Sequence, residues 1–145
     1  MNVIDNTYAI MKLQRKLGIN TFKAQTRFNT IHRLANYVLE GNIIKATFTE
    51  LARREGLSKQ NFHKMIKYRN KDIICVDSRT RADYTIYTHP AYYFVGSAEQ
   101  QKEALIHWYQ MNDYRDGSKD PFLLDEFRKA WFDLYPDGVA YQYQI

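Results

Sequence analysis

The 145-residue chain carries 21 Lys and Arg against 16 Asp and Glu, for a formal net charge of +5, and 45% of its residues are hydrophobic. This composition supports one folded domain, with or without an appended helical piece, and argues against wholesale disorder. The sequence has no run of about 18 apolar residues that would predict a membrane span, and residues 1–16 lack the pattern of a secretory signal. The lone Cys75 excludes an internal disulfide and fits a reducing cytoplasm; within the apolar run IICV, we expect it to be a small buried core residue.

Charge is distributed unevenly along the chain. Residues 1–81 hold 16 Lys and Arg against 6 Asp and Glu, a net of +10, whereas residues 82–145 hold 5 against 10, a net of −5. This asymmetry predicts one end that binds a polyanion and another that does not. The alternative is ordinary surface charge that happens to be unevenly scattered.

The first 47 residues predict helices followed by a short strand. Residues 1–20 allow either a helix ending at Gly18 or an extended arm. From Thr21, apolar residues recur at helical spacing as far as Leu39, and Gly41 with Asn42 supplies a stop signal after Glu40. Residues 43–47 (IIKAT) begin with β-branched side chains, which favour a brief strand.

Residues 47–68 (TFTELARREGLSKQNFHKMIKY) predict two short helices joined by a tight turn. Thr47 and Glu50 form a capping-box pattern at the start of the first helix, and Gly56 marks the turn. Ser58 is a favourable N-cap for the second helix. The apolar positions of the segment are Leu51, Ala52, Leu57, Phe62 and Met65. The remaining positions of the second helix are almost all hydrogen-bond donors or cations, as in a helix-turn-helix that reads DNA.

After Asn70 the pattern becomes extended. Residues 73–77 and 84–88 predict two strands around the polar loop 78–83. The order of helix, short strand, two helices and hairpin, over roughly residues 21–95, resembles the winged helix-turn-helix superfamily. This resemblance implies an α+β, mostly helical fold. It also implies that the second helix, about 58–70, lies in the major groove, and that the wing, residues 78–83, contacts the backbone or minor groove.

The C-terminal third predicts two further helices. Ser97 and Gln100 form a capping box before a helix over about 98–114, and Asp120 with Pro121 starts a last helix that Pro136 closes. We expect the tail, residues 141–145, to be loosely ordered. The expected organisation is an N-terminal arm or helix (1–20), a winged helix-turn-helix domain (21–96) and a C-terminal helical extension (97–145).

The candidate DNA-binding residues lie on three parts of the basic half. Gln60 and Asn61 have the bidentate amide geometry that reads adenine, and lysines reach guanine edges or phosphates. On the second helix we expect base contacts from Lys59, Gln60 and His63, backbone contacts from Ser58, Lys64 and Lys67, and either kind from Asn61. Arg53 and Arg54 on the first helix and Arg79 and Arg81 in the wing are further candidates, and Lys12, Arg15, Lys16, Lys23 and Arg27 could extend the basic surface. Alternatively, each of these side chains belongs to an ordinary solvated surface, and Arg53 and Arg54 pair with Glu50.

Aromatic residues are concentrated after the wing. They can be buried against the winged domain or against a second copy of the chain. Helices appended after the wing often supply the dimer interface in winged-helix proteins, so the resemblance implies a homodimer. The candidate interface residues are Trp108, Phe127, Trp131 and Leu134.

Catalytic and metal-binding patterns are missing from the sequence. The four histidines are isolated, one cysteine cannot form a cysteine-based zinc site, and no Gly-rich phosphate-binding loop occurs. Acidic residues near loops and helix starts are explained by capping and helix-dipole preferences. We therefore expect no enzymatic activity, no metal and no cofactor.

Three functional hypotheses follow. The first is a sequence-specific binder of double-stranded DNA that regulates transcription. The second is a plasmid or phage replication initiator that binds iterated origin sites, because IYTHPAYYFVGSAEQQKEALIHWY is similar to a segment of winged-helix initiators of small plasmids. The sequence lacks the paired metal-binding histidines of a rolling-circle nicking enzyme, so this hypothesis does not include nicking activity. The third is a winged helix used for protein contacts.

Overall fold

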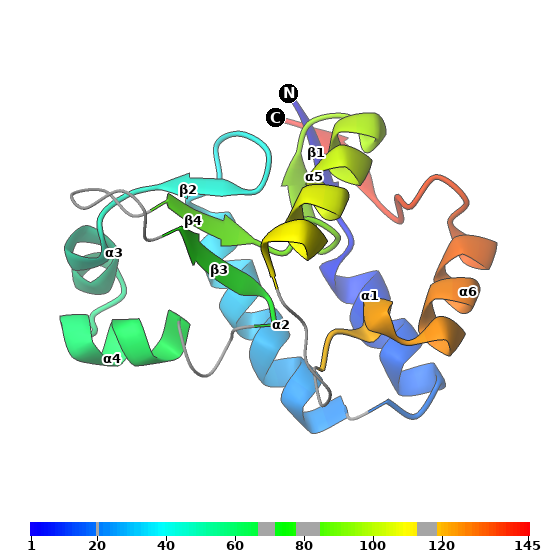
Figure 1. Ribbon diagram of the computed structural model, residues 1–145, viewed down its shortest axis with the longest axis horizontal. Coiled ribbons are helices and arrows are strands. Elements are labelled where there is room, and N and C mark those ends of the chain that lie inside the picture. The colour runs from blue at the N-terminus through cyan, green and yellow to red at the C-terminus, as the bar shows by residue number, and fades with distance from the viewer. Residues whose placement is uncertain (20, 67–71, 78–84, 113–118) are drawn as a thin grey trace.

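The computed structural model describes residues 1–19, 21–66, 72–77, 85–112 and 119–145. Its elements follow one another along the chain as shown in Figure 1. The helices are α1 (Thr7–Lys16), α2 (Thr21–Ala35), α3 (Phe48–Arg54), α4 (Lys59–Lys64), α5 (Ala98–Met111) and α6 (Asp125–Leu134), with a 3₁₀ turn η2 (Pro121–Leu123). The strands are β1 (Asn2–Asp5), β2 (Ile43–Lys45), β3 (Ile74–Asp77), β4 (Thr85–Thr88), β5 (Tyr93–Val95) and β6 (Gln142–Gln144).

The described residues form a mixed α+β fold with two small antiparallel sheets, which confirms the expected class. The first sheet has the order β2-β4-β3 and pairs Ile44 with Ile86 at its centre. Both side chains are buried because alternate residues of each strand face the core. Helices α3 and α4 lie together at one end of the molecule, and α6 lies at the other (Figure 1).

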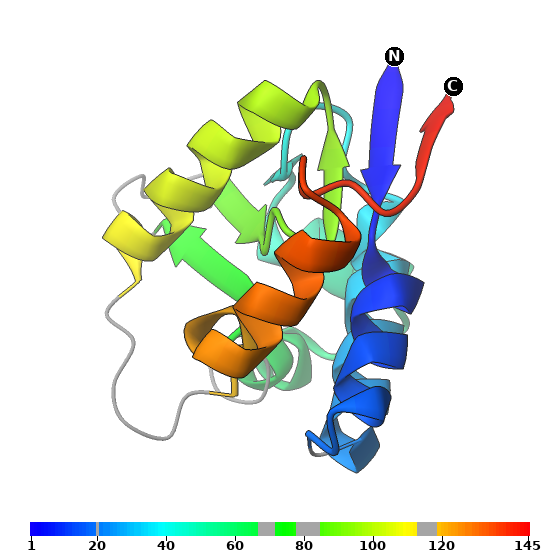
Figure 2. The same ribbon diagram turned by 90° about the vertical axis from the view of Figure 1, so that its right-hand side faces the viewer.

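The second sheet joins parts of the chain that are far apart in sequence. Strand β1 is its centre, with β5 on one side and β6 on the other, so the two termini lie side by side (Figure 2). The expectation of a loosely ordered tail is therefore wrong, because β6 is hydrogen-bonded to β1. The alternative of a free N-terminal arm is also wrong, since Val3 and Ile4 are fully buried and α1 forms as the helical alternative predicted.

Three predicted boundaries or environments differ from the structure. Helix α2 ends at Ala35 and not near Glu40, where the sequence predicted its end. The chain turns after Ala35 because Val38 is buried in the core and Gly41 exchanges backbone hydrogen bonds with Val95 of β5 (2.9 and 2.8 Å). The last helix begins at Asp125, after the 3₁₀ turn at Pro121. Cys75 is half-buried instead of fully buried.

One hydrophobic core cluster includes residues from all three expected parts of the chain, among them Val3, Ile31 and Phe127. Trp108 and Phe127 are 0% exposed and Trp131 is 1% exposed. The prediction that these three aromatic residues form a dimer interface is therefore wrong, because the single chain already buries them. Of the four candidates only Leu134, at 55% exposed, is accessible.

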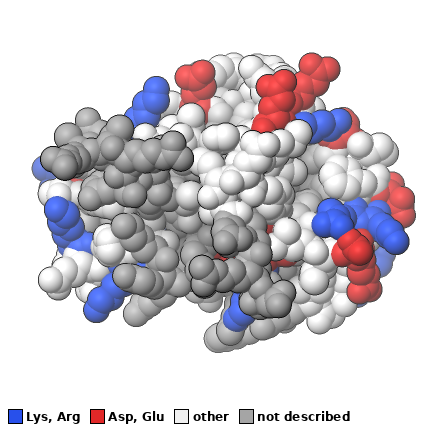
Figure 3. Space-filling model, viewed as in Figure 1, with Lys and Arg blue, Asp and Glu red and all other residues white. Residues whose placement is uncertain are grey.

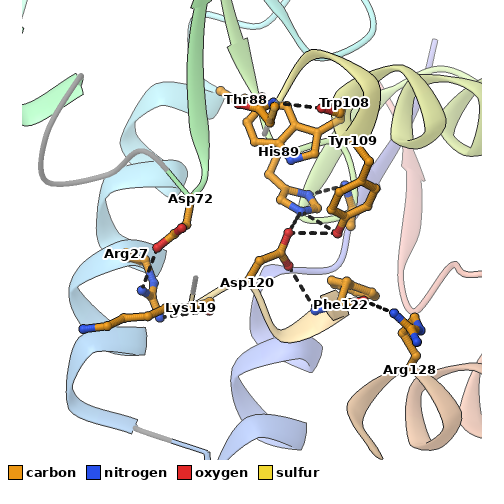
Figure 4. A network of polar contacts seen from close by, with 12 residues as sticks. Arg27, Asp72, Thr88, His89, Trp108, Tyr109, Lys119, Asp120, Phe122 and Arg128 are labelled. Atoms are coloured by element: carbon orange, nitrogen blue, oxygen red, sulfur yellow. Dashed lines mark hydrogen bonds and ion pairs between the residues drawn. The ribbon is translucent and has the colours of Figure 1, made fainter. Parts of the chain in front are cut away.

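A buried polar cluster joins the end of β4 to the C-terminal helices (Figure 4). The Nδ1 atom of His89 accepts a hydrogen bond from the Ala91 N–H (3.2 Å), so the ring hydrogen is on Nε2, which donates a hydrogen bond to Asp120 Oδ2 (2.9 Å). The Tyr109 hydroxyl donates to the same carboxylate oxygen (2.8 Å), and the Phe122 N–H donates to the other (3.0 Å). The contacts satisfy both oxygens of a carboxylate that water cannot reach.

Two further residues surround this cluster. The ring of Tyr92 meets that of His89 edge-on at 5.1 Å, and burial, followed by the negative charge of Asp120, raises the pKa of the Tyr92 hydroxyl well above its usual range. Arg27 of α2 pairs with Asp72 (3.6 Å) and is 9% exposed. Arg27 therefore does not extend the basic surface, contrary to the expectation from sequence.

Replacing Asp120 tests whether this cluster stabilises the fold. Asp120→Ala should lower the free energy of unfolding by about 2–4 kcal/mol, because the buried His89 N–H loses its nearer acceptor, the Tyr109 hydroxyl loses the carboxylate to which it donates, and a cavity remains. Asp120→Asn keeps an acceptor oxygen and should cost less. Chemical denaturation measures both, with Asp133→Ala on the exposed side of α6 as the control, expected within about 0.5 kcal/mol of the unmodified protein. Equal stability of Asp120→Ala and the control would contradict the assignment.

Candidate nucleic-acid interface

Two side-chain caps define the helices of the predicted helix-turn-helix. The hydroxyl oxygen of Thr47 accepts a hydrogen bond from the Glu50 N–H, and that of Ser58 accepts one from the Asn61 N–H, each at 3.1 Å. Both predicted N-caps are thereby confirmed. Between the helices Gly56 adopts a φ of +67°, a left-handed conformation that a side chain would strain, so the chain can turn tightly there.

The packing of α4 against α3 fixes which side of α4 faces solvent. Phe62 is fully buried and meets Phe48 of α3 edge-on, with ring centroids 5.8 Å apart. Leu51 of α3 is also fully buried, and Ile66 beyond the end of α4 is too. Because these residues all lie on one side, the opposite side of α4 is turned outward.

Most of the residues predicted to contact DNA are exposed: Gln60 and Lys64 lie opposite Phe62, and Ser58 and Lys59 lie at the start of the helix. Ser58, Lys59, Gln60, Asn61 and Lys64 are all exposed, and we refer to these five residues as the α4 face. Gln60 and Asn61 lie one turn before Lys64, so their polar ends form one continuous surface.

His63 differs from this group. It is half-buried, and its ring meets that of Phe48 edge-on at 5.8 Å, so it lies at the border of the α4 face. This contact with α3 restricts the directions in which the ring can approach a base edge. Sequence spacing alone did not show it, because the contact depends on how α4 is rotated against α3.

The two arginines of α3 are both exposed but differ in their contacts. Arg54 forms an ion pair with Glu50 at 2.6 Å, and this pair partly neutralises the charge of the arginine. The guanidinium of Arg54 also lies 5.9 Å from the centre of the Tyr37 ring. Arg53 has no ion pair within the described part of the chain. The remaining candidates Lys67, Arg79 and Arg81 lie outside the described residues.

On the face of the molecule that Figure 3 shows, charge is separated in space as well as in sequence. Lys and Arg occupy the end of the molecule that carries α3 and α4, whereas Asp and Glu gather toward α5 and α6, where some Arg and Lys are interspersed. Lys45 on β2 is also exposed, a basic residue that the sequence did not single out. A positive α4 end favours a polyanion, and repulsion from the acidic end disfavours other orientations.

Other kinds of site find little support in the described part of the chain. It contains no group of three or more His, Cys, Asp or Glu side chains placed to hold a metal ion. His89 and Asp120 are enclosed at 0% exposure, so a substrate cannot reach them. None of the described helices is both long enough and apolar enough to cross a membrane.

Comparisons with protein-family models, with curated proteins and with solved structures found no match for this chain. The candidate interface therefore rests on the geometry and charge of the α4 face.

The capping contact of Ser58 can be tested by its effect on stability. Ser58→Ala should lower the free energy of unfolding by about 1 kcal/mol, because the Asn61 N–H loses its acceptor. Gln60→Ala on the same exposed face serves as the control and should change stability by less than about 0.5 kcal/mol. Thermal or chemical denaturation measures both, and a Ser58→Ala protein as stable as the control would rule out the cap.

Proposed function

We propose that this protein binds double-stranded DNA in a sequence-specific manner, with α4 in the major groove, and acts as a transcriptional regulator. The α4 face carries the proposal: five exposed polar or cationic residues on a helix whose apolar side is fixed against α3. A solvated surface helix needs no such uniform set of donors, whereas a helix that reads base edges does.

The arrangement of elements supports a winged helix-turn-helix. Helix α2, strand β2, helices α3 and α4, and strands β3 and β4 follow one another in the order that the superfamily resemblance implies. Strand β4 lies between β2 and β3, so the β3–β4 hairpin is joined to the sheet beside α3 and α4. The resemblance implies that the loop of this hairpin, which lies outside the described residues, contacts the backbone or minor groove of the same DNA.

The chemistry of the α4 face matches both parts of DNA recognition. The amides of Gln60 and Asn61 can each donate to N7 and accept from N6 of adenine, and Lys59 can reach guanine edges. The Ser58 oxygen accepts from the Asn61 N–H, which leaves the Ser58 hydroxyl proton free to bond a phosphate. Lys64, one turn further on, would contact the backbone.

Sequencing the DNA fragments that the purified protein retains is the direct test. Genomic and mobile-element duplexes should be offered at about 150 mM salt, because lower salt strengthens the sequence-independent phosphate contacts. Enrichment of palindromes near promoters would support a dimeric regulator, whereas a single cluster of direct repeats would support a replication initiator. Retention without enrichment over random fragments would overturn sequence-specific binding and favour a role in protein contacts.

Gln60→Ala tests base recognition. On the selected site we expect a loss of about 1–3 kcal/mol in binding free energy and a relaxed preference at one base position, because the bidentate amide contact is removed. Fluorescence anisotropy on the selected duplex and on its single-base variants measures both effects. A uniform loss on all duplexes would place Gln60 at the backbone instead.

Lys64→Ala tests a backbone contact. It should weaken binding to every duplex by a similar factor and reduce the slope of log affinity against log salt by about one unit. Lys102→Ala removes the same charge from the exposed side of α5, at the acidic end of the molecule, and should leave that slope nearly unchanged. If the two variants behaved alike, general charge and not docking of α4 would account for binding.

A further inference from the structure

Strand β6 forms an open edge of the second sheet. One side of β6 pairs with β1, and no described strand pairs with its other side. Figure 2 shows β6 at the outer margin of the sheet, beyond β1. An open edge presents backbone donors and acceptors to any strand of matching shape.

The hydrogen-bond pattern shows which backbone groups of β6 are free to pair. Met1 and Ile145 exchange both backbone hydrogen bonds (3.1 Å each), and the Asp5 N–H donates to the Tyr141 carbonyl at 3.0 Å. Because antiparallel bonding alternates along a strand, Tyr143 also bonds toward β1. The N–H and C=O groups of Gln142 and Gln144 therefore point away from β1.

Apart from the short length of β6, which has three residues, this edge lacks the features that usually protect an exposed strand. Residues 141–145 include no lysine, no proline and no other charged side chain. Gln142 and Gln144 are exposed on one face, while Tyr143 packs toward the core on the other. Large side chains are also exposed close to β6: Tyr141 and Ile145 flank it, Met1 is bonded to Ile145, and Tyr8 lines one groove with Tyr141, each between 61% and 73% exposed.

We infer that two copies of the chain associate by antiparallel pairing of their β6 edges, with the two-fold axis at Tyr143. In this register Gln142 of one copy faces Gln144 of the other, so each pair exchanges two backbone hydrogen bonds. The two three-stranded sheets then join into one six-stranded sheet, and the two Tyr143 rings form a cross-strand aromatic pair.

A second copy fits this edge because the edge is complementary to itself. Strand β6 has three residues with Tyr143 at its centre. A rotation of 180° about an axis through Tyr143 therefore places the donors of one copy opposite the acceptors of the other. The side chains of residues 141–145 are all neutral, so the two paired strands do not repel each other. In Figure 1 the two termini lie at the top of the molecule and α3 and α4 lie at its left, so pairing through β6 leaves the α4 face open.

Charged side chains at positions 142 and 144 test this register. The double variant Gln142→Lys/Gln144→Lys places like charges opposite each other in both related pairs, which should weaken the dimer at least about tenfold. The matched double variant Gln142→Lys/Gln144→Glu places opposite charges in the same pairs and should keep the dimer. Both lose the contact between Gln144 and Asn2, so they differ only in the sign of one charge.

Sedimentation velocity across the micromolar range, without DNA, measures the association, and circular dichroism checks that each variant is folded. Mixing the Lys/Lys variant with Gln142→Glu/Gln144→Glu should restore dimers as a one-to-one complex. The proposal would be overturned if the unmodified protein stayed monomeric. It would also be overturned if the Lys/Lys variant dimerised as strongly as the unmodified protein. The loss of dimers in both the Lys/Lys and the Lys/Glu variant would contradict it as well. Because no DNA is present, the result is independent of the proposed function.

Discussion

The buried contact between His89 and Asp120 is the interaction on which the arrangement of the two halves depends. A carboxylate without water is costly unless every lone pair meets a donor, and here the donors come from the end of β4, from α5 and from the chain just before α6. The requirement can be met only when all three segments are in place. The contact therefore selects one position of the C-terminal helices against the sheet, and the aromatic residues Trp108 and Trp131 fill the space around it.

This arrangement separates two kinds of surface. The basic half of the chain forms the α3–α4 end of the molecule. The large apolar side chains of these two helices are buried in the core, and polar and charged side chains face solvent. The second sheet lies away from α3 and α4, and its β6 edge has neutral side chains and is unpaired within the described chain. The surface that we propose for a polyanion and the edge that we propose for a second copy are therefore separate, so one does not block the other.

Local features of the sequence predicted local features of the structure well. The caps at Thr47, Ser58 and Ser97 each involve residues three positions apart, so their hydrogen bonds follow from helix geometry alone. The exposed positions of α4 also followed from periodicity. His63 did not, because its burial depends on how close α3 lies. The concentration of aromatic residues after position 90 left two predictions open, burial within the chain or against a second copy, because a sequence does not reveal whether a large apolar side chain is buried within its own chain.

The sequence by itself determined the α+β class, the order of the elements between α2 and β4, and the uneven charge, because each depends on residue type and on spacing over a few positions. Only the tertiary structure decided the second sheet, the buried His89–Asp120 contact and the burial of Trp108, Phe127 and Trp131. Strand β1 is four residues long and its partners begin about 90 and 140 positions away. Pairing over such distances is governed by how well the whole core packs, and no short stretch of sequence carries that information.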